Sequence, residues 1–161
     1  MFQKTSIAIA LSFLLTIGAF GQSLSQNEID EFSGERVVAA ESISIEHEGF
    51  SGTARIIPAY TNNEYVFILT VMSRDSWQIL GADNAQFIID EDRNRFSLLR
   101  IDTDTNRGNV VEQYGMKFNQ QEFEKIANAS DVRFRINGNV YTVNQEVKDS
   151  VQLVIDTVNE Q

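Results

Sequence analysis

Apolar and polar residues alternate most regularly near the C-terminal end of the chain. The runs 132–136 (Val-Arg-Phe-Arg-Ile) and 139–143 (Asn-Val-Tyr-Thr-Val) alternate with a period of two, and Asn137-Gly138 lies between them. This pattern predicts a β-hairpin with a two-residue turn, because Asn and Gly both tolerate the positive φ that such a turn requires. The hairpin is the most clearly specified element of the sequence.

The predicted hairpin has one apolar face and one charged face. A two-residue turn places Phe134 opposite Tyr141, and both side chains then lie on the same side of the two strands. Arg133 and Arg135 alternate with Phe134 and therefore project from the opposite side. The apolar face is expected to pack beneath the helices, and the two arginines are expected to face solvent.

A predicted helix lies on each side of this hairpin. Asn119 and Glu122 have the spacing of a capping box, in which each side chain bonds the backbone N–H of the other residue. This helix is expected to end near Ser130. Asn144 caps a second helix. Its apolar residues recur at helical spacing, at Val147, Val151, Val154, Ile155 and Val158.

The chain before the first helix predicts strands. The expected extended runs are 37–45, 53–59, 65–72, 85–89, 96–101 and 109–118. Strands followed by helices favour an α+β fold. We therefore expect a single α+β domain over 37–161. It would be an antiparallel sheet of about six or seven strands, with two C-terminal helices packed on one face.

The run 65–72 is apolar at both odd and even positions, which is typical of a strand covered on both faces. The two helices can cover only one face. Segments 37–45 and 53–59 could fold over the other, which favours a monomer. If they only extend the sheet, the exposed apolar face predicts a protein partner or a homodimer.

The first 21 residues have the pattern of a cleaved signal peptide. Lys4 is followed by a mostly apolar stretch over 7–17, and Ala19-Phe20-Gly21 places small residues at a cleavage site. The expected location is therefore the periplasm or the extracellular space. The next segment, 22–36, is acidic and is expected to be a tail with one short helical turn over 26–32. No membrane span is expected after removal of the signal.

Composition narrows the function further. The 161 residues include no cysteine and carry a formal net charge of −10, which becomes −11 when Lys4 leaves with the signal peptide. The fold must therefore be held by its core rather than by disulfides. A strongly acidic chain disfavours nucleic acid as a partner.

Two Asp-rich segments are candidate calcium loops. Both 90–95 and 102–107 have the pattern D-x-D-x-N-R, and alternating oxygen side chains can converge on a hard cation. The candidate ligands are Asp90, Asp92, Asn94, Asp102, Asp104 and Asn106. Neither segment has the glycine and glutamate spacing of an EF-hand, and Asp and Asn are also common turn residues. The favoured interpretation is therefore that both segments are turns, and calcium is the alternative.

Arg133 and Arg135 are the candidate ligand-binding residues, because two arginines on one strand face can hold a carboxylate or another anion. The favoured interpretation is nevertheless a solvated face, or ion pairs with the acidic tail. His47 is the only histidine and fits a solvated strand end. Trp77 is expected to pack in the core rather than to lie on a binding surface.

The sequence thus predicts a small exported interaction or structural module that is not an enzyme and needs no cofactor. A calcium-dependent binding protein that uses the Asp-rich loops is the second hypothesis. A hydrolase that uses a pair of carboxylates is the third. The pattern of residues specifies neither the ligand nor the oligomeric state.

Overall fold

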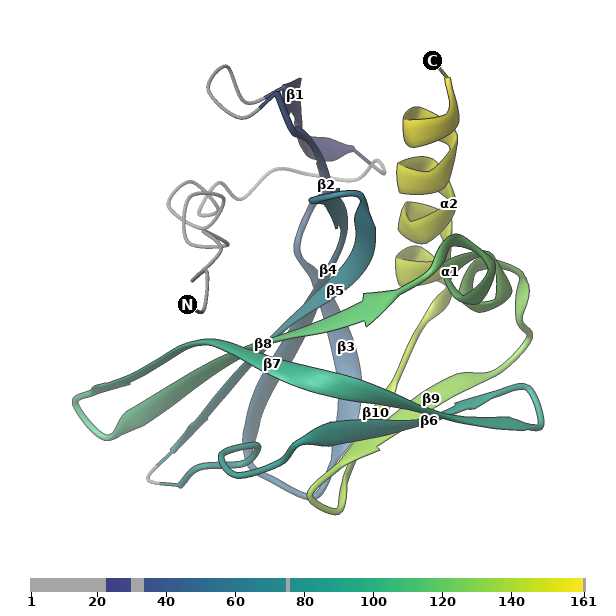
Figure 1. Cartoon of the computed structure of the whole chain (residues 1–161). Coiled ribbons are helices and arrows are strands. Elements are labelled where there is room, and N and C mark those ends of the chain that lie inside the picture. Colours follow the sequence, from purple (N-terminus) through teal and green to yellow (C-terminus); the bar gives the residue numbers. More distant parts are fainter. Residues whose placement is uncertain (1–22, 30–33, 75, 161) are drawn as a thin grey trace, which may run out of the picture.

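The computed structural model describes residues 23–29, 34–74 and 76–160, which form ten strands and two helices (Figure 1). The predicted signal peptide lies outside the described residues. The strands are β1 (Leu24–Ile29), β2 (Arg36–Ala40), β3 (Ile43–Glu48), β4 (Gly52–Thr61), β5 (Glu64–Arg74), β6 (Asn84–Ile89), β7 (Asp92–Asn106), β8 (Asn109–Phe118), β9 (Val132–Ile136) and β10 (Asn139–Thr142). The helices are α1 (Gln120–Asn128) and α2 (Gln145–Asn159).

Eight of these strands form a closed antiparallel barrel. The ring runs β4-β3-β10-β9-β6-β7-β8-β5, and β5 pairs again with β4. The expected open sheet with two helices on one face is therefore wrong. The strand runs were found, but the pairing of β3 with β10, which joins residues 46–48 to residues 140–142, leaves no local signal in the sequence.

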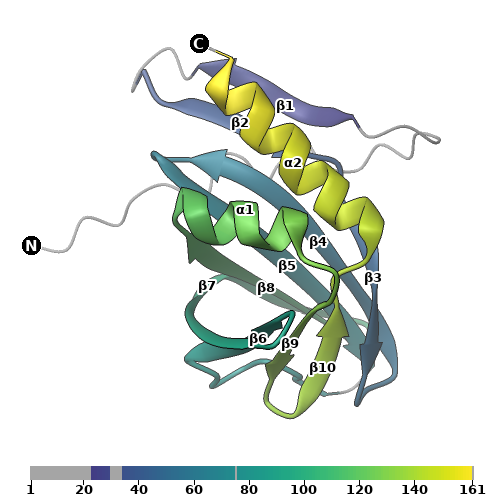
Figure 2. The same cartoon turned by 90° about the vertical axis from the view of Figure 1, so that its right-hand side faces the viewer.

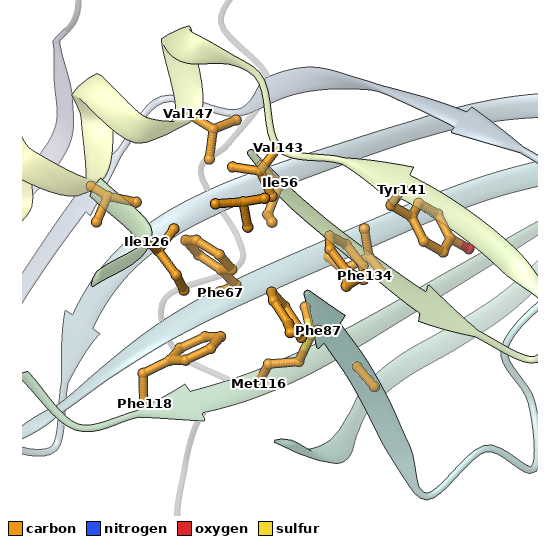
Figure 3. Packing of buried hydrophobic residues seen from close by; sticks show 14 of the residues in the cluster. Ile56, Phe67, Phe87, Met116, Phe118, Ile126, Phe134, Tyr141, Val143 and Val147 are labelled. Carbon is orange, nitrogen blue, oxygen red and sulfur yellow. The ribbon is translucent and has the colours of Figure 1, made fainter. Parts of the chain in front are cut away.

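Aromatic side chains fill the barrel. Phe87, Phe134 and Tyr141 stack in register across β6, β9 and β10, with ring centroids 4.8 Å apart in each neighbouring pair (Figure 3). The predicted pairing of Phe134 with Tyr141 is confirmed. A strand that slipped by one residue would turn these rings outward, so the stack fixes which residues face solvent.

The helices lie together at one end of the barrel (Figure 2). The capping box of α1 is confirmed, because Glu122 N–H donates to Asn119 Oδ1 (2.9 Å) and Asn119 N–H donates to the Glu122 carboxylate (2.8 Å). Phe123 of α1 is fully buried and contacts the rings of Tyr65 and Phe67 on β5. Helix α1 thus packs on β5 and β8, whereas α2 lies along β4 and β2, the second of which is outside the barrel ring.

Strand β5, which is apolar on both faces, packs each face in a different apolar cluster. Its odd positions, such as Phe67 and Leu69, point into the main core. Val66 and Ile68 point to the other side of the wall, in a second, smaller apolar cluster. The rest of this cluster comes mainly from β2 and β4, at Ala39, Ile57 and Ala59, with Ile101 of β7 packed against it.

Two further sequence-based expectations are corrected. The segment 22–36 is not simply a tail, because β1 pairs with β2 to form a hairpin. No helical turn lies in its described part. Strand β7 is also much longer than the expected 96–101, so the connections on either side of it shrink to short turns at 90–91 and 107–108. Among the described helices, neither has the length and apolar character that crossing a membrane requires.

Candidate anion-binding site

Four arginines gather on the outer wall of the barrel. Register places Arg95 of β7 and Arg135 of β9 on either side of Gln86 of β6. Ile88 of β6 lies in the same way between Arg93 of β7 and Arg133 of β9. We call these six residues the arginine face. They form a two-by-two array of charges with β6 along its middle.

The array follows directly from the packing inside the barrel. Phe87 is buried between Gln86 and Ile88, and Phe134 is buried between the two arginines of β9. Successive side chains of a strand point to opposite faces, so burying the rings drives the arginines outward. The backbone spacing is then about 7 Å along a strand and about 10 Å across two strand intervals. A ligand with several negative groups could span this area.

The four arginines differ in their partners. Arg133 Nε donates to Asp131 Oδ2 at 2.9 Å, and an Arg135 nitrogen donates to Gln86 Oε1 at 2.5 Å. The side chains of Arg93 and Arg95 make neither a hydrogen bond nor an ion pair within the described residues. All four side chains are exposed. At least two guanidinium groups are therefore ready to bind an anion without breaking an internal contact.

The charge of this face contrasts with the rest of the chain. The sequence has 13 basic and 23 acidic residues, yet four of the basic ones lie within one small area. Guanidinium groups bind carboxylate, sulfate and phosphate through two parallel hydrogen bonds. Sequence reasoning found Arg133 and Arg135 but missed Arg93 and Arg95, which it placed in a loop. Only the longer β7 aligns the second pair with the first.

A groove of about 420 Å³ adjoins the arginine face. Polar side chains line it: Asp83, Asn84, Gln86, Arg135 and Asn137. Gln86 and Arg135 thus belong to both the groove and the arginine face. Gly138 also lines the groove. The Asn137-Gly138 turn has positive φ at both residues (49° and 86°), which confirms the predicted hairpin turn.

One wall of the groove comes from the loop 76–83, which a single carboxylate fixes to the barrel. Glu112 of β8 is fully buried, and its oxygens accept from the backbone N–H groups of Gln78 (2.6 Å), Ile79 (3.0 Å) and Leu80 (2.7 Å). Three charge-assisted bonds offset the cost of burying the charge. They also occupy both carboxylate oxygens, so Glu112 has a structural role.

The fixed loop displays two apolar side chains. Trp77 is 42% exposed and Leu80 is 44% exposed, although Ile79 between them is fully buried. The expectation that Trp77 packs in the core is therefore wrong. Ile79 and the N–H groups bonded to Glu112 face the barrel. Trp77 therefore lies on the side of the loop that faces solvent. No periodic pattern in the sequence could have shown this.

The first Asp-rich segment is a turn followed by a strand. Asp90 has a positive φ of 54°, and its carboxylate accepts from the N–H groups of Ser130 (2.8 Å) and Asp131 (3.0 Å). Asp92 and Asn94 already belong to β7. These contacts give Asp90 a role in joining the β6–β7 turn to the segment after α1.

The second Asp-rich segment is also strand rather than loop. Asp102 and Asp104 accept from the N–H groups of Thr103 (2.8 Å) and Thr105 (2.7 Å), their next neighbours. Asn106 ends β7, and the turn itself is Arg107-Gly108. Across the described residues, no three acidic or histidine side chains form a group that could hold a metal. Calcium binding remains a prediction.

His47, the only histidine of the sequence, lies near the end of β3. The His47 ring stacks on Phe50 with centroids 4.0 Å apart, and its Nε2 lies 3.1 Å from the Gly52 carbonyl oxygen. Its ring is half-buried rather than fully solvated. These contacts fit a packing role at the β3–β4 turn.

Comparison with protein-family models, with curated proteins and with solved structures finds no match to this chain. Its function must therefore be argued from the geometry of the described residues.

Proposed function

We propose that this protein is an exported, non-enzymatic binding module whose arginine face takes an anionic partner. One observation carries the proposal: Arg93, Arg95, Arg133 and Arg135 stand in register on one side of a barrel whose overall sequence charge is −10. Isolated surface arginines would normally be dispersed among acidic residues. The four arginines are concentrated in one array, and the side chains of two of them have no partner among the residues that the structure describes. This arrangement favours recognition of negative charge.

The rest of the molecule supports binding rather than catalysis. The barrel interior is packed with rings and aliphatic side chains. Among the described residues, Glu112 is the one buried carboxylate, and it is bonded to backbone N–H groups. The pattern of residues 1–21 supports export to the periplasm or beyond. A rigid barrel with its recognition groups on the outer wall suits a binding module.

The proposal is tested with poly-L-glutamate as the probe, by calorimetric titration at low salt. The double variant Arg93→Gln with Arg95→Gln should bind at least about tenfold more weakly, since each charge-assisted hydrogen bond contributes about 1.5–3 kcal/mol. Affinity of the unchanged protein should fall as salt is added, because exposed charges are screened.

The matched control is Arg74→Gln with Arg107→Gln, which removes two exposed arginines from other parts of the barrel. The control changes net charge by the same amount and should bind within about twofold of the unchanged protein. Equal weakening by the two double variants would show that net charge, rather than the arginine face, determines binding.

A further inference from the structure

The arginine face excludes one common mode of peptide recognition. Strand β6 pairs with β7 on one side and with β9 on the other, so its backbone N–H and C=O groups are already used. An extended peptide therefore cannot add beside β6 as an extra strand. A ligand that lies over β6 must be recognised through side chains.

The groove beside the arginine face has the polar groups of a site for hydroxyls. The Asn84 amide can both donate and accept, whereas Asp83 only accepts. Gln86 Nε2 remains able to donate, because the Arg135 bond uses Gln86 Oε1. Asn137 Oδ1 remains able to accept, because the bonds to two backbone carbonyls use Asn137 Nδ2. A site for a simple anion would not include a carboxylate such as Asp83, because like charges repel. A hydroxyl group both donates and accepts, so it can satisfy this mixture of side chains.

An exposed aromatic ring lies on the loop that forms the groove wall. Asn137 lines the groove, and its Nδ2 donates to the carbonyl oxygens of Gln78 (3.4 Å) and Ile79 (3.2 Å). Trp77 directly precedes Gln78 in the chain and is 42% exposed. The loop is held by Glu112, so little ordering is required when a ligand binds. Trp77 does not itself line the groove, but its loop also supplies Gly81, Ala82 and Asp83 to the lining. A flat apolar ring can contact the C–H face of a sugar.

We infer that the arginine face and its groove bind an acidic oligosaccharide, a sugar chain that carries carboxylate or sulfate groups. Its hydroxyls occupy the groove, its acidic groups pair with Arg135 and then with Arg93 and Arg95, and a sugar ring lies against Trp77. This inference rests on the proposed function, because it names the ligand class of the same face.

The test uses an oligogalacturonate of about five sugars, its methyl-esterified form and poly-L-glutamate as probes. Trp77 is the only tryptophan in the chain, so its emission reports on this loop alone. The oligogalacturonate should shift Trp77 emission to shorter wavelength and protect the ring from acrylamide. The methyl ester keeps every sugar hydroxyl and loses only the charge, so it should bind at least about tenfold more weakly.

Two variants separate the contributions in calorimetric titrations. Trp77→Ala should weaken binding of oligogalacturonate by about tenfold and leave binding of poly-L-glutamate unchanged, since a peptide lacks the sugar face. Arg135→Gln should weaken binding of both probes. Arg107→Gln is the control and should change neither by more than about twofold.

The outcomes separate this inference from the proposed function. If poly-L-glutamate binds and oligogalacturonate does not, or if Trp77→Ala weakens both probes equally, the sugar assignment is wrong and an acidic protein partner takes its place. The same holds if oligogalacturonate binds without changing Trp77 emission. If none of the three probes binds, the proposed function fails together with the inference.

Discussion

The stacked rings of Phe87, Phe134 and Tyr141 hold the register on which the arginine face depends. Each ring is at most 1% exposed, and each faces its neighbour directly across the strands. The alternation around Phe134 was sufficient to predict its pairing with Tyr141 and the outward direction of Arg133 and Arg135. That success is local, because the Asn-Gly turn fixes the register within a few residues.

This account predicts very different effects from two adjacent positions. Phe134→Ala removes a ring from the centre of the stack and should lower the free energy of unfolding by about 3–5 kcal/mol. Arg135→Ala removes an exposed side chain and should change it by less than about 1 kcal/mol. A denaturant titration measures both values. Similar losses would mean that the face assignment is wrong.

Tyr141 gives a pH-dependent prediction at the same scale. Its hydroxyl is buried without a hydrogen bond from any described residue. Burial, and then the charge of Glu112, raise the pKa of Tyr141 well above its ordinary value, while the Asn139 side chain opposes the shift. The neutral form is favoured in the folded state, so the stability linked to Tyr141 is full below about pH 10 and is lost as the pH rises further.

We therefore expect Tyr141→Phe to be nearly neutral at pH 7, because an unbonded hydroxyl contributes little. Above about pH 10 the variant should lose less stability than the unchanged protein, although Tyr65 and Tyr114, whose pKa values burial also raises, keep some of the dependence. Unfolding titrations at pH 7 and pH 11 provide the measurement. Parallel losses in the two proteins would contradict the assignment.

At the scale of elements, the hairpin of β7 and β8 extends beyond the barrel and leaves one edge of β7 unpaired (Figure 1). The pair Asn106–Asn109 closes the turn, so the ladder directs the N–H groups of Thr103 and Thr105 toward this edge. The carboxylates of Asp102 and Asp104 accept from these two groups. The Asp-rich pattern that resembles a cation loop thus covers an exposed strand edge.

Removal of these caps should make the edge available for pairing between molecules. The double variant Asp102→Ala with Asp104→Ala should form dimers or larger species at micromolar concentration, whereas the unchanged protein is expected to stay monomeric. Light scattering measures the mass of each. Glu48→Ala with Glu91→Ala removes two exposed carboxylates elsewhere and should stay monomeric. If this control also associates, the loss of negative charge, rather than the exposed edge of β7, causes the association.

Elements with local signals were predictable, and those without them were not. Both helices and the β9–β10 hairpin carry caps or a turn within their own sequence. Strand β7 was underestimated because its Asp and Asn residues are typical of turns, although here they belong to a strand. The same error concealed Arg93 and Arg95. Two of the four arginines of the arginine face were therefore absent from the sequence-based expectation.

At the scale of the whole molecule, closure of the barrel gives the face its final form. Strand β10 joins β3 by pairing residues 140–142 with residues 46–48, and no local pattern in the sequence indicates so distant a contact. Closure pairs both edges of β6 and of β9, so the middle of the recognition wall has no free strand edge. The backbone of β6 and β9 is then held in the barrel wall, and the side chains are the groups available to a ligand. The proposed recognition of anions therefore depends on a feature that sequence reasoning missed.

Chemical-shift mapping of the protein titrated with poly-L-glutamate tests the central claim most directly. The account predicts that the perturbed amide and arginine side-chain signals lie on the outer face of β6, β7 and β9, led by Arg93 and Arg95. It also predicts that the signals of Arg55, Arg74 and Arg107 keep their chemical shifts. Perturbations spread over all exposed arginines, or centred away from β6, would contradict the assignment of the arginine face as the binding site.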